Sequence, residues 1–123
     1  MERAFIYNGE ARKVFPIVAF GNKYDVIVVP RQYNSDGTLA LKVLDIVDNE
    51  DHNDQMYAEP FGTLTVNMSS DLQSGTQAFV KSYSENEDWA DKLAEAIGGK
   101  KTNISKQAGY ASVSLWDFSN INV

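Results

Sequence analysis

Residues 84–99 read SENEDWADKLAEAIGG, and this stretch decides the fold class because the hydrophobic period of the chain changes here. Trp89, Leu93 and Ile97 recur at four-residue intervals, which is the apolar stripe of an amphipathic helix. The sequence therefore predicts one helix over residues 86–97.

The two ends of this helix carry capping signals. Ser84 and Glu87 have the Ser-x-x-Glu form of a capping box, in which each side chain satisfies a free amide of the other residue. Gly98 and Gly99 follow the last apolar position and are typical of a left-handed C-cap.

The rest of the chain alternates as strands do. Asn8-Gly9 is the strongest short hairpin signal and predicts a turn between strands at 4–7 and 11–18. Further strands are predicted at residues 24–29, 38–47, 62–68, 77–83 and 110–118. The expected fold class is α+β, an antiparallel, mostly meander β-sheet with a single helix packed on one face. Residues 1–123 are expected to form a single domain.

Composition excludes several classes of protein. The 123 residues include no cysteine, which rules out disulfides, thiolate metal sites and cysteine nucleophiles. No apolar run approaches the roughly 20 residues that cross a bilayer, so no membrane association is expected. The start, Met1-Glu2-Arg3, lacks a signal-peptide pattern, and we expect a cytoplasmic location.

The charge is acidic and unevenly distributed. The net charge is −6, and no Lys or Arg lies between Lys42 and Lys81. An acidic protein is a poor general binder of nucleic acid, because neutralising phosphates supplies most of that affinity. A protein partner with a basic surface suits the chain better, since opposite charge speeds their encounter.

The most acidic stretch, VDNEDHNDQ at residues 47–55, resembles a metal site only superficially. An EF-hand loop starting at Asp48 would have Asn53 where the sharp turn needs glycine, and its fifth position would be His52. A transition-metal site would need a second histidine, and His52 is the only one. We therefore expect an acidic hairpin turn, with no metal and no cofactor.

Catalytic motifs are equally weak. No Gly-x-Ser-x-Gly elbow is present, and a triad would have to use His52 in an exposed loop. The stretch GGKKT at 98–102 follows a helix instead of preceding one, which favours a helix C-cap over a phosphate loop. The sequence predicts a protein that is not an enzyme, and a hydrolase using His52 is the weakest alternative.

Two acidic segments are the candidate partner-binding surface. Asp88, Asp91 and Glu95 recur at helical spacing opposite the apolar stripe, and an ordinary solvated helix face is the competing interpretation. The candidate residues are Asp48, Glu50, Asp51, Asp54, Glu87, Asp88, Asp91 and Glu95. Three tyrosines near strand ends are either partner anchors or core residues: Tyr33, Tyr57 and Tyr83.

Several segments carry a resemblance to a known family. They are Tyr7-Asn8-Gly9, the stretch PFGTLTVNM at 60–68, Asn86-Glu87-Asp88-Trp89-Ala90 and Trp116-Asp117-Phe118. In this order they resemble an uncharacterised domain-of-unknown-function family of small proteins carried on conjugative and other mobile elements of mainly Gram-positive bacteria. The chain departs from that family in a longer acidic insert at 48–59 and a lysine-bearing loop after the helix.

The resemblance implies a context, and the residues leave two main hypotheses. Small acidic proteins of mobile elements often inhibit host defence, as anti-CRISPR and anti-restriction proteins do, by covering a nuclease surface. The alternative is an accessory module that binds protein or single-stranded nucleic acid, with Lys100, Lys101 and Lys106 beside Tyr110 as a stacking platform. The sequence leaves the oligomeric state open.

Overall fold

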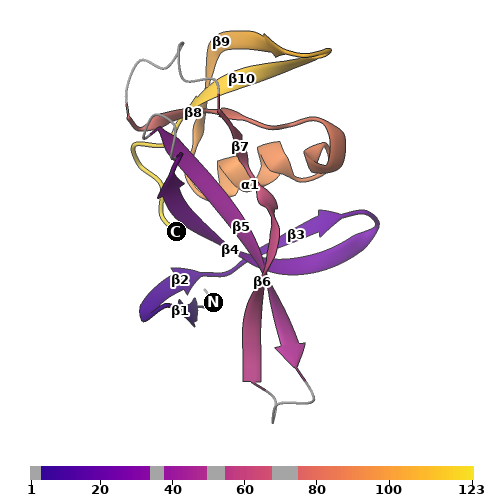
Figure 1. The fold of residues 1–123 in the computed structure, drawn as a ribbon, viewed down its shortest axis with the longest axis vertical. Coiled ribbons are helices and arrows are strands. Elements are labelled where there is room, and N and C mark those ends of the chain that lie inside the picture. Colours follow the sequence, from indigo (N-terminus) through magenta and orange to yellow (C-terminus); the bar gives the residue numbers. More distant parts are fainter. Residues whose placement is uncertain (1–3, 34–37, 50–54, 68–74) are drawn as a thin grey trace.

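Strands dominate the chain, with one α-helix and one short 3-10 turn among the described residues, which are 4–33, 38–49, 55–67 and 75–123 of a computed structural model (Figure 1). The strands are β1 (Ala4–Tyr7), β2 (Glu10–Lys13), β3 (Phe15–Ala19), β4 (Asn22–Gln32), β5 (Leu39–Asn49), β6 (Gln55–Thr63), β7 (Thr65–Val66), β8 (Gln77–Val80), β9 (Lys100–Ala108) and β10 (Ala111–Asp117). The 3-10 turn is η3 (Ser84–Asn86), and the helix is α1 (Ala90–Ala96).

The first two strands form the predicted Asn-Gly hairpin. Tyr7 lies opposite Glu10 in the antiparallel register, and both turn residues have positive φ, 51° for Asn8 and 82° for Gly9. A two-residue loop of this type needs positive φ at both central positions, which Asn and Gly tolerate best. The hairpin prediction is confirmed.

The predicted strand at 11–18 is wrong as a single element, because the chain changes sheets at Val14. β2 pairs with β1, whereas β3 pairs with β4. At the break, the backbone N–H of Lys13 donates to the backbone oxygen of Val123 (2.9 Å). The end of the chain therefore holds the point where the two strands separate.

The described strands form three sheets, not one. β1 and β2 stand alone, β3-β4-β5-β6 is a four-stranded antiparallel meander, and the other four-stranded sheet has the order β7-β8-β10-β9. The antiparallel α+β class is confirmed. The meander describes the first four-stranded sheet only, because β8 and β10 become neighbours across the helix and β9.

Strand β9 replaces the expected lysine-bearing loop after the helix. Its sequence, KKTNISKQA, lacks the apolar alternation that predicts strands, because it is an outer strand with mostly exposed side chains. It pairs with β10 along most of its length, with an irregularity between Ser114 and Trp116. An edge strand of this kind gives little hydrophobic signal in a sequence.

The predicted strand at 62–68 is divided at Leu64, where the two four-stranded sheets are joined. The N–H of Leu64 donates to the backbone oxygen of Leu41 (2.9 Å), and the N–H of Lys81 donates to the oxygen of Leu64 (2.8 Å). The N–H of Leu41 in turn donates to Oγ1 of the buried Thr65 (3.2 Å). Leu64 thus bonds to β5 on one side and to the end of β8 on the other.

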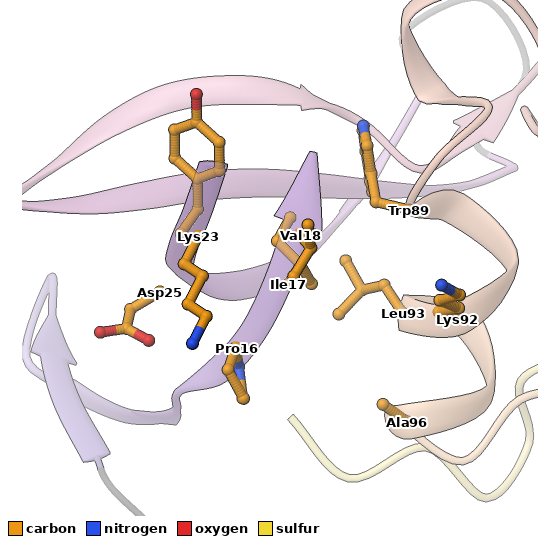
Figure 2. A pocket seen from close by; sticks show the side chains of 10 residues that line it. Pro16, Ile17, Val18, Lys23, Asp25, Trp89, Lys92, Leu93 and Ala96 are labelled. Carbon is orange, nitrogen blue, oxygen red and sulfur yellow. The ribbon is translucent and has the colours of Figure 1, made fainter. Parts of the chain in front are cut away.

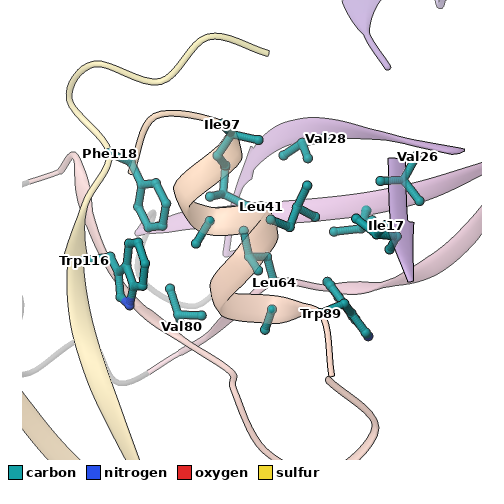
Figure 3. Packing of buried hydrophobic residues seen from close by; sticks show 14 of the residues in the cluster. Ile17, Val26, Val28, Leu41, Leu64, Val80, Trp89, Ile97, Trp116 and Phe118 are labelled. Carbon is teal, nitrogen blue, oxygen red and sulfur yellow. The ribbon is translucent and has the colours of Figure 1, made fainter. Parts of the chain in front are cut away.

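One hydrophobic core lies between the helix and both four-stranded sheets (Figure 3). Helix α1 contributes Leu93 and its C-cap residue Ile97, the meander contributes Val28 and Leu41, and the second sheet contributes Trp116. The helix therefore does not simply cover one face of one sheet. It fills the space that the two sheets share.

The opposite face of the meander is covered by the β1–β2 hairpin. Ile27, Val29 and Ile46 are buried there against Phe5 and Tyr7. The sequence Val26-Ile27-Val28-Val29 is accordingly apolar without alternation, because successive side chains of β4 enter two different cores.

The helix begins later than predicted, and its capping box is wrong. Ser84 has φ of +58°, outside the extended region that an N-cap residue adopts, and neither η3 nor α1 has a side-chain cap. Instead, Asn86 is buried and its Nδ2 donates to the backbone oxygen of Thr63 (2.8 Å). This tertiary bond holds the segment in a 3-10 turn, and regular helix starts only at Ala90.

The helix end matches the prediction. Gly98 has φ of +97°, its N–H donates to the oxygen of Glu95 (3.0 Å), and the N–H of Gly99 donates to that of Ala94 (2.9 Å). This is the paired bonding of a Schellman cap. Over the described part of the chain, no helix has the length and apolar character needed to cross a membrane.

Candidate protein-binding surface

Four of the predicted partner-binding residues lie on α1 and the turn before it. Glu87 and Asp88 precede the helix, Asp91 and Glu95 are one turn apart within it, and all four side chains are exposed. None of them forms an ion pair with another described residue. We call these four residues the acidic row.

The acidic row stands on a firmly anchored support. Trp89 is 2% exposed, its Nε1 donates to the backbone oxygen of Glu85 (3.1 Å), and its ring meets that of Phe61 edge-on at 5.2 Å. Gly62 lies under the same indole, since a Cβ there would be 3.4 Å from Trp89 Cζ2. The segments at 60–68 and 86–90 that carry the family resemblance therefore pack against each other.

Two lysines border the acidic row on the side of the second sheet. Lys100 and Lys101 of β9 line a shallow depression of about 540 Å³ together with Asp91 and Glu95. No ion pair closes this depression among the described side chains. Lys92 of α1 lines the depression as well, so carboxylates and lysines meet there and the lysines border the acidic row.

On its other side, α1 forms an apolar groove with β3 (Figure 2). The groove has a volume of about 350 Å³, and its apolar lining includes Ile17, Trp89 and Leu93. Lys23 and Lys92 are among its charged lining residues. Sequence reasoning missed this groove, because it forms between two elements that lie far apart in the sequence.

The structure describes only one residue of the second predicted acidic segment, Asp48. Asp48 belongs to β5, opposite Met56 of β6, whereas Glu50, Asp51 and Asp54 lie outside the described residues, as does His52. The β5–β6 hairpin runs to the end of the molecule away from α1 (Figure 1). The structure therefore does not bring Asp48 together with the acidic row.

The tyrosines proposed as partner anchors have mostly structural surroundings. The Tyr33 hydroxyl lies 3.0 Å from Thr65 Oγ1, and Tyr83 is half-buried with Lys81 Nζ 5.6 Å from its ring centre. Only Tyr57 is exposed, and its hydroxyl donates to Glu59 Oε1 (2.9 Å), which raises the pKa of that phenol.

A small group of carboxylates lies on the meander. Asp45 of β5 is directly opposite Glu59 of β6, and Asp25 is nearby on β4. Partial burial raises the pKa of Asp45, and the negative charges of Glu59 and Asp25 raise it further. No group of three or more potential metal ligands is found among the described residues, which do not include His52.

Comparison of the chain with protein-family models, curated proteins and solved structures gives no significant match. The family resemblance stays a prediction that rests on the residues quoted for it.

Proposed function

We propose that this protein is a non-enzymatic anti-defence inhibitor that binds a basic, nucleic-acid-binding or catalytic surface of a host nuclease, such as a CRISPR or restriction enzyme, in the bacterial cytoplasm. The observation that carries the proposal is the acidic row, whose four exposed carboxylates lack ion-pair partners among the described residues.

Physical chemistry favours such a row as a competitor of nucleic acid. Asp91 and Glu95 lie one helical turn apart, and this spacing is on the scale of successive phosphates. These carboxylates form no ion pair with the described residues, so no pair within that part of the chain is broken when they meet a partner. The buried Trp89 and Asn86 hold the support of the row, which limits the entropy lost on binding.

The basic margin contributes orientation. Lys100 and Lys101 repel a positively charged partner at the side of the row that faces β9. A basic surface is therefore favoured over the helix and disfavoured over the adjacent strand, which is how unlike charges select one docking geometry.

The test combines affinity capture with charge reversal. Tagged protein is incubated with lysate of a Gram-positive host, captured nucleases are identified, and inhibition of the purified nuclease is measured at low and high salt. Asp88→Lys with Asp91→Lys is expected to weaken inhibition by roughly tenfold or more, since charges at an interface act on both rate and affinity.

A matched control has the same change in net charge away from the row. Glu10→Lys with Glu59→Lys alters exposed residues of β2 and β6 and is expected to leave inhibition nearly unchanged. Equal effects of both double variants, or inhibition that survives reversal of the row, would show that the acidic row is not the contact surface.

The accessory module that binds single-stranded nucleic acid is the alternative. Its basic residues are spread along β9: Lys101 pairs with Trp116, whereas Tyr110 lies in the turn after Ala108. At about 3.4 Å per residue, roughly 20–25 Å of strand separates them. Tight binding of an oligonucleotide at moderate salt, lost in Lys100→Glu with Lys101→Glu, would favour this alternative over the inhibitor.

A further inference from the structure

The outer strand β3 differs from the other outer strands of the four-stranded sheets. β6 carries Glu59 and Pro60, β9 carries three lysines, and β7 has only two residues. Charge, proline and shortness are the usual protections of a sheet edge against pairing with another chain. β3 reads FPIVA, with no charged residue and Pro16 as its only protection.

The turn after β3 fixes which backbone groups face outward. Ala19 and Asn22 flank the two-residue loop Phe20-Gly21, whose φ values are +54° and +79°. Residues flanking such a loop form a hydrogen-bonded pair, and these pairs alternate along an antiparallel ladder. Ala19 and Ile17 therefore bond to β4, and the N–H and C=O of Val18 point away from it.

The same alternation places two more groups on the open edge, the C=O of Pro16 and the N–H of Phe20. Proline has no N–H to offer there. The C=O of Phe20 is also occupied, since Asn22 Nδ2 donates to it (3.3 Å). The open edge thus offers backbone donors and acceptors at regular intervals, except for the N–H that Pro16 lacks and the C=O of Phe20 that Asn22 occupies.

We propose that β3 is the interface of a homodimer, in which it pairs antiparallel with β3 of a second copy around a two-fold axis at Val18. In this register the two Val18 residues exchange both backbone bonds. Each Phe20 N–H donates to the C=O of Pro16 of the other copy. The missing N–H of Pro16 then falls opposite the C=O of Phe20 that Asn22 already satisfies.

Side chains favour the same register. Val18 and Phe20, both 57% exposed in the single chain, come opposite Val18 and Pro16 of the second copy. Pro16 lines the groove between β3 and α1, so the exposed part of Phe20 of the second copy comes beside an apolar hollow of about 350 Å³. The two-fold contact removes the same apolar patch from water on both copies, which favours association.

A second copy is the occupant because the edge is self-complementary and uncharged. A different protein strand would find no charge on β3 to set its register, whereas a second copy matches the two missing groups of the edge when the pairing is centred on Val18. Five residues per strand make a small interface, below the roughly 1,200 Å² of stable complexes, so a weak dimer is expected. A dissociation constant in the range of about 1–100 μM fits that size.

A single cysteine tests the register directly, because the chain has none of its own. Hydrogen-bonded antiparallel pairs have Cα atoms about 5.5 Å apart, which falls within the range of about 4.4–6.8 Å that a disulfide spans. Val18→Cys is expected to form a disulfide-linked dimer rapidly under mild oxidation. Ile104→Cys, at an exposed position of the outer strand β9, is the control and is expected to stay monomeric.

The second measurement is sedimentation velocity at protein concentrations from about 1 μM to about 1 mM, a range that includes the expected dissociation constant. Val18→Lys puts a charge on the edge and is expected to raise the dissociation constant at least roughly tenfold. Ile104→Lys is expected to leave it unchanged. Phe20→Asn keeps a residue that tolerates the positive φ of the turn and is expected to weaken the dimer while the fold persists.

Salt separates this dimer from the proposed inhibitor contact. Pairing through an uncharged edge is expected to persist at high salt, whereas binding through the acidic row is expected to weaken. A chain that is monomeric at 1 mM, or a Val18→Lys variant that dimerises like the parent, overturns the dimer and leaves the proposed function untouched.

Discussion

At the scale of single residues, Asn86 links the helix segment to the meander. Its side chain is buried, its Nδ2 bonds to the backbone oxygen of Thr63, and its Oδ1 has no partner among the described residues. Asn86→Ala removes the bond but also removes the unpartnered oxygen. We expect a loss of about 1–2 kcal/mol in the free energy of unfolding, toward the lower part of the range for an orphaned buried group.

Urea denaturation followed by the fluorescence of the tryptophans measures this loss. Asn103→Ala, an exposed residue of β9, is the control and is expected to change stability by less than about 0.5 kcal/mol. Equal stability of Asn86→Ala and the parent would mean that Thr63 finds another partner without cost.

Asp45 is the residue whose charge opposes folding. Burial and the charges of Glu59 and Asp25 raise its pKa, so the native state holds the Asp45 proton more tightly than the unfolded chain does. Its contribution to stability is therefore most favourable below the usual pKa of an aspartate and declines as the pH rises through the raised value.

Asp45→Asn is accordingly expected to stabilise the protein at pH 7 by a few tenths of a kcal/mol, since it removes a like-charge cross-strand pair with Glu59. The gain is expected to shrink at pH 3, where Asp45 is protonated in both states. Denaturation of parent and variant at the two pH values gives the comparison, and a gain that is the same at both would point to a cause other than charge.

At the scale of elements, the two ends of the helix depend on different information. The C-cap at Gly98 depends on local backbone geometry, and Gly98-Gly99 predicts it correctly. The start depends on Asn86 reaching Thr63, a contact across 23 residues that no local pattern shows. The Ser-x-x-Glu pattern was a reasonable local signal, but the tertiary contact prevailed.

The Schellman cap gives a prediction with two matched controls. Gly98→Ala must keep a φ of +97° and would place a Cβ 3.0 Å from the backbone oxygen of Asn120. A loss of about 2 kcal/mol or more is expected from left-handed strain plus that contact. Gly9→Ala has the positive φ in open space and is expected to lose about 1 kcal/mol, and Gly75→Ala, with no contact within 4 Å, close to nothing.

Thermal or urea denaturation of the three variants gives the ranking. If Gly98→Ala and Gly9→Ala lose equal stability, the contact with Asn120 adds nothing to the strain of the left-handed backbone.

At the scale of the whole molecule, the class was predictable and the assembly of the sheets was not. Periodicity located most strands and the helix, and composition indicated an acidic chain. The chain passes from the β1–β2 sheet to the meander at Val14, and Leu64 joins the two four-stranded sheets. Both features depend on residues that are far away in the sequence. The exposed acidic residues were predicted from helical spacing, although Glu87 and Asp88 precede the helix, whereas the β3–α1 groove depends on two elements that are distant in the sequence.

The last three residues tie distant parts of the molecule together. Ile121 and Val123 pack against the main core, the N–H of Asn122 donates to the oxygen of Ile97 (2.9 Å), and Val123 accepts from Lys13. Removing residues 121–123 is expected to cost about 2–4 kcal/mol, the sum of two backbone bonds and two partly buried apolar side chains.

Denaturation of the truncated chain checks this expectation, with Asn122→Ala as the control because it keeps both backbone bonds. Hydrogen exchange adds a local measurement: the amide of Lys13 is expected to exchange faster after truncation. Unchanged protection at Lys13 would mean that β2 is held by its other contacts.

The bond between Lys13 and Val123 joins two residues that are synthesised at very different times. The ribosome makes Lys13 early and Val123 some hundred residues later, so the partner of the first segment is still inside the exit tunnel while most of the chain has emerged. The bond that holds the junction between β2 and β3 therefore forms only after Val123 has left the ribosome. The β1–β2 and β3–β4 hairpins are local and can form before that moment, so the junction at Val14 is completed after the strands on either side of it.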